Sequence, residues 1–214
     1  MPERLLFNHE RPMTVICAYT DGAATWIGSD TYGIATGGIP MEVGKKWYGA
    51  HGWAFGHCGD AYVADLFEEE AETLFAELRR PLEFVWRARE MFERAGLKAS
   101  YREGETVGNW QNSGILVRAG SIWDIDDNLA VTSIPGGRLH ARGSAGCEAK
   151  SAAYGYARAM RKAKPRTRIL PLELINVAID CAIEFDVNIR GKWMDWLGPG
   201  DGEISVRWPR IGAV

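Results

Sequence analysis

The order of predicted elements along this 214-residue chain indicates an α+β protein with layered sheets. Strand-like segments are followed by two amphipathic helices, and strands followed by two helices then occur again. Each sheet and each helix pair has an apolar face to bury. Two sheets stacked face to face, with a helix pair outside each, would bury all of these faces. A content of 46% hydrophobic and 25% charged residues is ordinary for one globular domain.

The first half of the chain predicts four strands and two helices. The strands are expected at residues 14–20, 24–30, 45–50 and 52–57. Asp21-Gly22 supplies the turn residues that a hairpin between the first two strands needs. The glycine-rich residues 31–44 show no period and are expected to form a loop.

The first helix is predicted from Asp60 to just before Pro81, because apolar residues recur on one face at three-to-four spacing. A second helix over 82–95 is expected to direct Trp86 inward together with other apolar side chains. Residues 99–111 are polar and predict a connection to the next strands.

The second half predicts another four strands and two helices. The strands are expected at 112–118, 121–125, 129–133 and 138–142, and the helices at 145–162 and 171–186. Small residues along the first of these helices would let it lie close to a sheet. In the tail, residues 204–208 predict one short strand. The tail also holds three tryptophans that suit either a subunit interface or the core, namely Trp193, Trp196 and Trp208.

Three residues suited to chemistry recur at a fixed spacing. Thr14, Asp30 and Lys46 lie sixteen residues apart, and each lies near an end of a predicted strand. A threonine hydroxyl is a poor nucleophile that needs a nearby base, and an N-terminal threonine carries one in its own α-amine, whose pKa is about 7.7–8.0. A lysine ammonium would lower the proton affinity of both groups, and Asp30 would hold that lysine. The backbone N–H of Gly59, at a helix start, is the expected donor to an oxyanion.

Each of these residues also has an ordinary structural interpretation. Thr14 could simply start a strand, Asp30 could accept a hydrogen bond in a turn, and Lys46 could be a charge on an edge strand. His51 and His57 are candidate general bases, although neither has a recognisable nucleophile beside it in the sequence. A structural role for both histidines is the simpler hypothesis.

The pattern Thr-x15-Asp-x15-Lys, together with Gly-His-Cys-Gly-Asp at 56–60 and Gly-Ser-Ala-Gly at 143–146, resembles the proteasome β-subunit family. The bacterial HslV-type peptidases are the most similar in style, and the resemblance extends from about residue 14 to about residue 191. It implies the four-layer αββα sandwich of the N-terminal-nucleophile hydrolases. It also implies a threonine-type endopeptidase whose nucleophile is Thr14.

The resemblance further implies roles for individual residues. Gly59 matches the glycine of the oxyanion hole, and Ser144 matches a serine near the terminal amine. Asp186 matches a carboxylate that orients this serine and the amine. In the family a Ser or Thr and then a Gly follow that carboxylate closely, whereas the residues from 187 to Gly191 lack the hydroxyl. Glu184 is the alternative position for the carboxylate.

The mechanism requires a free amine on Thr14, yet thirteen residues precede it. Residues 1–13 are therefore expected to be a leader, and 14–214 a single hydrolase domain. Translation could begin at Met13, which is the preferred interpretation, or Thr14 could cleave a propeptide itself. Family propeptides commonly have glycine where this chain has Met13. A retained leader would instead make the protein an inactive, structural ring subunit.

Charge and composition narrow the expected partners. A net charge of −3 without a basic stripe argues against nucleic acid, and the absence of an apolar run of eighteen residues argues against a membrane span. Four widely spaced cysteines without a Cys-x-x-Cys pair suit reduced thiols in the cytoplasm rather than a zinc site, and no cofactor is expected. The resemblance implies a polypeptide substrate, a homo-oligomeric ring and a possible ATP-dependent unfoldase. A small-molecule amidase with the same nucleophile is a further alternative.

Overall fold

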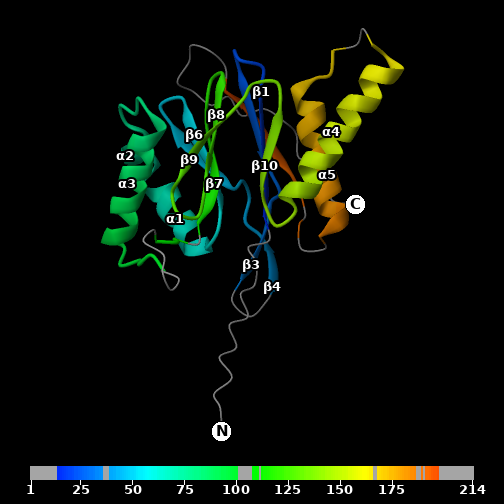
Figure 1. The fold of residues 1–214 in the computed structure, drawn as a ribbon. Coiled ribbons are helices and arrows are strands. Elements are labelled where there is room, and N and C mark those ends of the chain that lie inside the picture. The colour runs from blue at the N-terminus through cyan, green and yellow to red at the C-terminus, as the bar shows by residue number, and fades with distance from the viewer. Residues whose placement is uncertain are drawn as a thin grey trace.

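The computed structural model describes residues 14–35, 39–100, 108–110, 112–165, 168–186, 189 and 191–197. In this part of the chain, two antiparallel sheets face each other between two groups of helices (Figure 1). The helices from the first half of the chain cover one sheet, and those from the second half cover the other. The predicted four-layer αββα sandwich is therefore confirmed.

The first sheet has the strand order β10-β1-β2-β11. Its strands are β1 (Val15–Thr20), β2 (Thr25–Ser29), β10 (Leu139–Gly143) and β11 (Trp193–Leu197). The second sheet has the order β5-β6-β7-β8-β9. Its strands are β5 (Trp47–Ala50), β6 (Trp53–Cys58), β7 (Ser113–Arg118), β8 (Ser121–Ile125) and β9 (Val131–Ile134).

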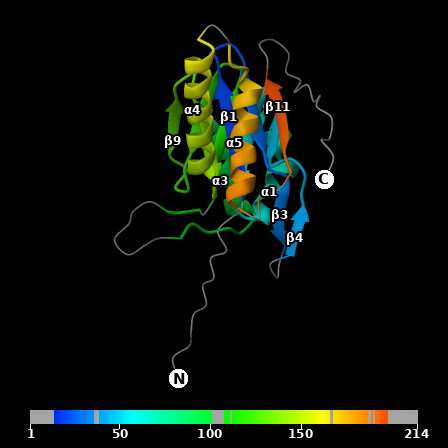
Figure 2. The same ribbon diagram turned by 90° about the vertical axis from the view of Figure 1, so that its right-hand side faces the viewer.

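Helices bury the outer face of each sheet, and a third apolar layer fills the space between the sheets. The helices are α1 (Ala61–Glu69), α2 (Ala71–Phe75), α3 (Pro81–Arg94), α4 (Gly146–Ala163) and α5 (Pro171–Phe185). Figure 2 shows α4 and α5 side by side over the sheet that contains β1 and β11. The small residues Ala149 and Ala153 of α4 are buried there, as predicted. A Cβ at Gly28 of β2 would lie 2.7 Å from Ile175 of α5, so that helix also packs closely.

The turn between β1 and β2 has the predicted chemistry. Asp21 accepts hydrogen bonds from the N–H groups of Ala23 and Ala24, both at 3.0 Å, through its Oδ1 atom. Gly22 has a φ of 95°, which only glycine adopts without strain. This turn fixes the register in which Ile16 pairs with Ser29. The start of β1 and the end of β2 consequently lie side by side.

The structure differs from the sequence-based expectations in two strand regions. Residues 31–44 were expected to form a loop, but they contain the antiparallel strands β3 (Tyr32–Ala35) and β4 (Ile39–Glu42), which form a two-stranded hairpin. β11 at the edge of the first sheet was not predicted. The strand expected at 204–208 and the side chains of the three tail tryptophans lie outside the described residues.

The first helix pair is also more broken than expected. The predicted helix start near Asp60 is confirmed, with Asp60 as the N-cap of α1, but α1 is followed by the separate helix α2, which ends at Phe75. The guanidinium of Arg87 donates to three carbonyl groups at the end of α2, and Glu77 has a positive φ of 51°. The prediction that Trp86 points inward is wrong, because 56% of this residue is exposed. The inward-facing residues of α3 follow the spacing of Phe84, Val85, Ala88, Met91 and Phe92.

Candidate active site

Thr14 immediately precedes β1, where the first sheet meets the loop after β10. Its carbonyl oxygen accepts a hydrogen bond from the N–H of Ser144 at 2.9 Å. Gly143 has a φ of 107°, and a Cβ there would overlap that same carbonyl oxygen. Glycine is therefore required at this position, because the chain passes so close to Thr14.

The three residues with the sixteen-residue spacing meet at one point. The Lys46 Nζ atom donates to Thr14 Oγ1 at 2.9 Å and to Asp30 Oδ2 at 2.8 Å. Asp30 follows β2 and Lys46 precedes β5, so the two sheets contribute the two charges. All three residues are at least 90% buried, with exposed fractions of 7%, 0% and 8% for Thr14, Asp30 and Lys46.

Backbone groups hold the buried carboxylate in place. Asp30 Oδ1 accepts from the N–H of Val15 at 2.9 Å, and Oδ2 accepts from the N–H of Tyr32 at 3.3 Å. Burial raises the pKa of Asp30, while the ammonium of Lys46 and these N–H groups oppose the rise. Lys46 is fixed through its backbone as well, because its N–H donates to the hydroxyl of the buried Ser29 at 3.2 Å.

Ser144, whose backbone N–H binds the Thr14 carbonyl oxygen, forms a second polar pair with Asp186. Ser144 Oγ donates to Asp186 Oδ2 at 3.1 Å, across the gap between the start of α4 and the end of α5. Of the two carboxylates considered from the sequence, Asp186 contacts this serine, whereas Glu184 is exposed on α5.

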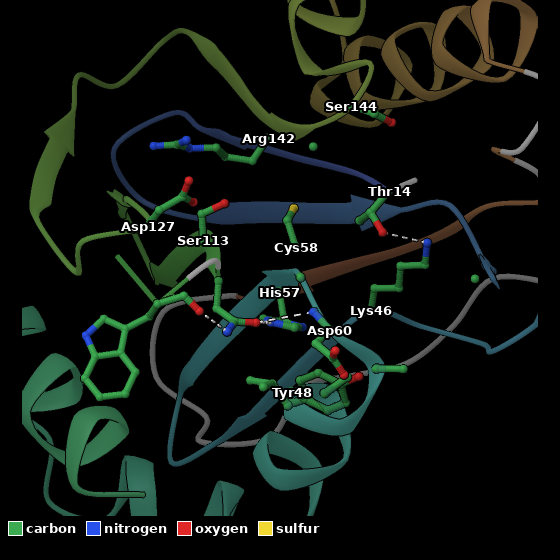
Figure 3. A pocket seen from close by; sticks show the side chains of 18 of the residues that line it. Thr14, Lys46, Tyr48, His57, Cys58, Asp60, Ser113, Asp127, Arg142 and Ser144 are labelled. Atoms are coloured by element: carbon green, nitrogen blue, oxygen red, sulfur yellow. Dashed lines mark hydrogen bonds between the residues drawn. The ribbon is translucent and has the colours of Figure 1, made fainter. Parts of the chain in front are cut away.

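A large cavity of about 2080 Å³ opens beside Thr14, Lys46 and Ser144, which line it. In Figure 3 the side chains of Thr14 and Lys46 point toward each other at its edge, and Ser144 lies on a neighbouring loop. Gly59, between β6 and α1, also lines the cavity. Among the described residues, the N–H of Gly59 has no hydrogen-bond acceptor. The site thus presents a hydroxyl next to an ammonium, with an available N–H donor on the same cavity wall.

Three solved structures have the same arrangement of elements. BPH from Thiobacillus denitrificans superposes with a TM-score of 0.64 at 15% identity, and the match covers 87% of this chain and 100% of BPH. The complex of that protein with epoxomicin gives 0.65 at 14% identity and covers 88% and 100%. HslV from Trypanosoma brucei gives 0.59 at 19% identity and covers 86% and 99%. No protein-family model and no curated protein sequence matches the chain.

The chain has the proteasome β-subunit and HslV-like fold. At identities of 14% to 19%, this likeness concerns the fold.

The two histidines considered as general bases are both engaged elsewhere. His57 is 4% exposed, and its Nε2 atom contacts Asn112 Oδ1 at 2.9 Å. Burial lowers the pKa of His57 to about 4, so the imidazole is neutral at physiological pH. His51 lies in the turn before β6 and contacts Glu72 at 3.0 Å. Neither arrangement provides a base for Thr14.

A second ionic cluster on the cavity wall was not found from the sequence. Asp124 of β8 contacts Arg142 of β10 through both carboxylate oxygens, at 2.5 and 2.7 Å, and His140 at 2.9 Å. Burial would raise the pKa of Asp124, but its contacts with these two side chains hold it at about 2. This cluster joins the two sheets next to the loop that carries Ser144. Asp124 and the pair His140 and Arg142 lie on strands of different sheets, so only the sheet packing reveals the cluster.

The described residues contain no group of three or more His, Cys, Asp or Glu side chains arranged to hold a metal ion. All four cysteines are unpaired with one another. Burial raises the pKa of Cys58, which lines the cavity, to about 12, so it is a thiol rather than a thiolate nucleophile. None of the helices in the described residues combines the length and apolar character of a membrane span.

Proposed function

We propose that the protein is a threonine peptidase that hydrolyses peptide bonds with Thr14 as an N-terminal nucleophile. The observation that supports this most directly is the position of Lys46 Nζ, 2.9 Å from Thr14 Oγ1 and 2.8 Å from Asp30 Oδ2. A buried ammonium at this distance stabilises developing negative charge on the hydroxyl oxygen. The proteasome-like fold and the epoxomicin complex of one structural neighbour agree with such an activity.

In the proposed reaction, Thr14 Oγ attacks the substrate carbonyl carbon while its proton passes to the α-amine of the same residue. The N–H of Gly59 binds the oxyanion of the tetrahedral intermediate. The amine then returns the proton to the leaving amine, and an acyl ester on Thr14 remains. Water hydrolyses this ester and regenerates the hydroxyl.

The remaining polar residues are proposed to set up these steps. Lys46 and Asp30 supply the electrostatic environment of the hydroxyl. We propose that Ser144, oriented by Asp186 at 3.1 Å, contacts the α-amine; its own N–H binds the Thr14 carbonyl oxygen, which supports this role. No metal or organic cofactor takes part in the proposed hydrolysis.

The mechanism requires that residues 1–13 be absent from the active enzyme, either because translation starts at Met13 or because a leader is cleaved. We propose that the domain 14–214 acts in the cytoplasm as a homo-oligomeric ring on polypeptide substrates, with an ATP-dependent unfoldase as a possible partner. The proteasome-like and HslV neighbours support this assembly by analogy of fold.

Hydrolysis of fluorogenic peptides by the wild type and by Thr14→Ala and Thr14→Ser tests the proposal. We expect Thr14→Ala to abolish hydrolysis and Thr14→Ser to retain part of it, since serine keeps both the hydroxyl and the amine. Unchanged hydrolysis by Thr14→Ala would refute the mechanism. An inactive wild type that retains residues 1–13 would favour the structural ring subunit, and hydrolysis of simple amides alone would favour a small-molecule amidase.

A further inference from the structure

Asn112 lies opposite Gly59, the proposed oxyanion donor, although no sequence motif marks it. It immediately precedes β7, and the β6–β7 ladder ends with the pair Cys58 and Ser113. Asn112 therefore lies across from Gly59, at the point where the backbone pairing of the two strands stops. It is 7% exposed and lines the same cavity as Thr14.

The carboxamide of Asn112 makes three hydrogen bonds. Its Oδ1 atom faces His57 Nε2 at 2.9 Å and accepts from the N–H of Asp60 at 3.3 Å, and its Nδ2 atom donates to the carbonyl of Trp110 at 2.6 Å. These partners require a side chain that accepts on one side and donates on the other, which an amide provides. Because Oδ1 can only accept, His57 must carry its proton on Nε2. A pKa of about 4 for His57 agrees with this neutral form.

These bonds fix both ends of the segment around Gly59. On one side, the β6–β7 ladder holds Cys58. On the other, the N–H of Asp60 binds Asn112, while the Asp60 carboxylate caps α1 by accepting from the N–H of Tyr62 at 2.8 Å. The N–H of Gly59 lies between these two anchors and has no acceptor among the described residues.

Asn112 also lies directly against Gly59. A Cβ at Gly59 would overlap Asn112 Oδ1 and would come within 2.8 Å of His57 Nε2. The neutral pair of His57 and Asn112 therefore forms the surface on which the Gly59 turn rests. Figure 3 shows His57 and Asp60 close together on this wall of the cavity, with Cys58 nearby.

We infer that Asn112 is a positioning residue for catalysis: with the neutral His57 as its partner, its carboxamide holds the Gly59 N–H toward the oxyanion formed on Thr14. This inference rests on the proposed function. An oxyanion donor contributes only if it is aimed at the charge before the charge forms, so a turn that can rotate loses part of that contribution. The His57–Asn112 pair must also be neutral. A negative charge next to the Gly59 N–H would repel the oxyanion that this N–H binds.

The test compares Asn112→Ala and Asn112→Asp with a matched control, Asn176→Ala. Asn176 is a partly buried asparagine with two side-chain partners, Asp180 and Lys192, but it lies on α5 and does not line the cavity. The measurements are kcat and KM for one peptide substrate, the pH dependence of kcat, the melting temperature, and the pKa of His57 by nuclear magnetic resonance.

For Asn112→Ala we expect kcat to fall about 10- to 100-fold with KM changed less than about twofold, below the 10²- to 10³-fold cost of losing a donor entirely. For Asn112→Asp, the new carboxylate should raise the pKa of His57 into the range of about pH 5–8, and kcat should acquire a titration there that the wild type lacks. Asn176→Ala should keep the wild-type kcat even where its melting temperature falls.

The outcomes separate this inference from the proposed function. Hydrolysis that depends on Thr14, together with a wild-type kcat in folded Asn112→Ala and Asn112→Asp, would overturn the role of Asn112 alone. If Asn112→Ala does not fold, Asn112→Asp provides the test. A raised pKa of His57 without a new titration in the pH dependence of kcat would also overturn the role of Asn112. A wild type without peptidase activity, or activity that survives Thr14→Ala, would overturn both proposals.

Discussion

Replacing Asp30 with asparagine is expected to destabilise the protein strongly, because the ammonium of Lys46 would stay buried without its counter-charge. The two side chains are 0% and 10% exposed, and the atoms Oδ2 and Nζ are 2.8 Å apart. With an effective dielectric constant of about 20, two unit charges at this distance attract by about 6 kcal/mol. Desolvation offsets part of this attraction, so we expect a net loss of about 3–5 kcal/mol when one partner is removed.

Removing both charges should restore much of the stability. In Asp30→Asn/Lys46→Met, no buried charge remains, and the asparagine oxygen can still accept from the N–H of Val15. The double variant should therefore be more stable than the single Asp30→Asn variant, although it should be as inactive. Lys46→Met alone leaves a buried carboxyl whose pKa is raised. A raised pKa in the folded state favours the protonated form, so this variant should lose stability as pH rises above about 4.

Urea denaturation of the four proteins at about pH 5 and pH 8 measures this cycle, with hydrolysis assayed in parallel. The account predicts a coupling free energy of at least about 2 kcal/mol and loss of activity in all three variants. Additive losses of stability, or a double variant that regains hydrolysis, would refute the reasoning that this ion pair is both buried and functional.

Three further predictions concern the surroundings of the site. His57 has a folded pKa of about 4 against an ordinary value near 6.5, so the wild type should lose up to about 3 kcal/mol of stability as pH falls through this window, and His57→Gln should lose less. Asp124→Asn should cost about 2 kcal/mol at neutral pH, measured by urea denaturation, because a carboxylate with a pKa of about 2 contributes stability that is present above about pH 4 and lost below it. Gly59→Ala should lower both stability and kcat, since its Cβ would overlap Asn112 Oδ1, whereas Gly155→Ala, with open space on α4, should be neutral or stabilising and leave kcat unchanged. An unperturbed melting temperature in Gly59→Ala would contradict the tight packing of that turn.

Local patterns predicted most of the strands and helices, because binary patterning determines both the element and its buried face. Asp60 capping α1 and the Asp21-Gly22 turn are examples in which short-range chemistry was sufficient. The helix expected up to Pro81 ends early at a tertiary contact: Arg87, from the next helix, donates to carbonyl groups at the end of α2.

The strands β3 and β4 escaped prediction for a different reason. Their sequence is rich in glycine and contains Pro40, so it lacks the alternation that marks a half-buried strand. Only the pairing of the two segments with each other makes them strands.

The candidate site could be predicted in part. The spacing of Thr14, Asp30 and Lys46 was visible because each adjoins a strand, and the structure brings them together. The position of Asn112 could not be predicted from the sequence. Its contact with Gly59 depends on the register of β6 and β7, which local patterns do not determine.

Identification of the N-terminal residue of the catalytically active protein by mass spectrometry tests the central claim most directly. The account predicts that every active molecule begins at Thr14, with residues 1–13 absent and a free α-amine. Active protein that still carries residues before Thr14 would contradict the account, because the amine that is proposed to accept the hydroxyl proton would then be part of a peptide bond.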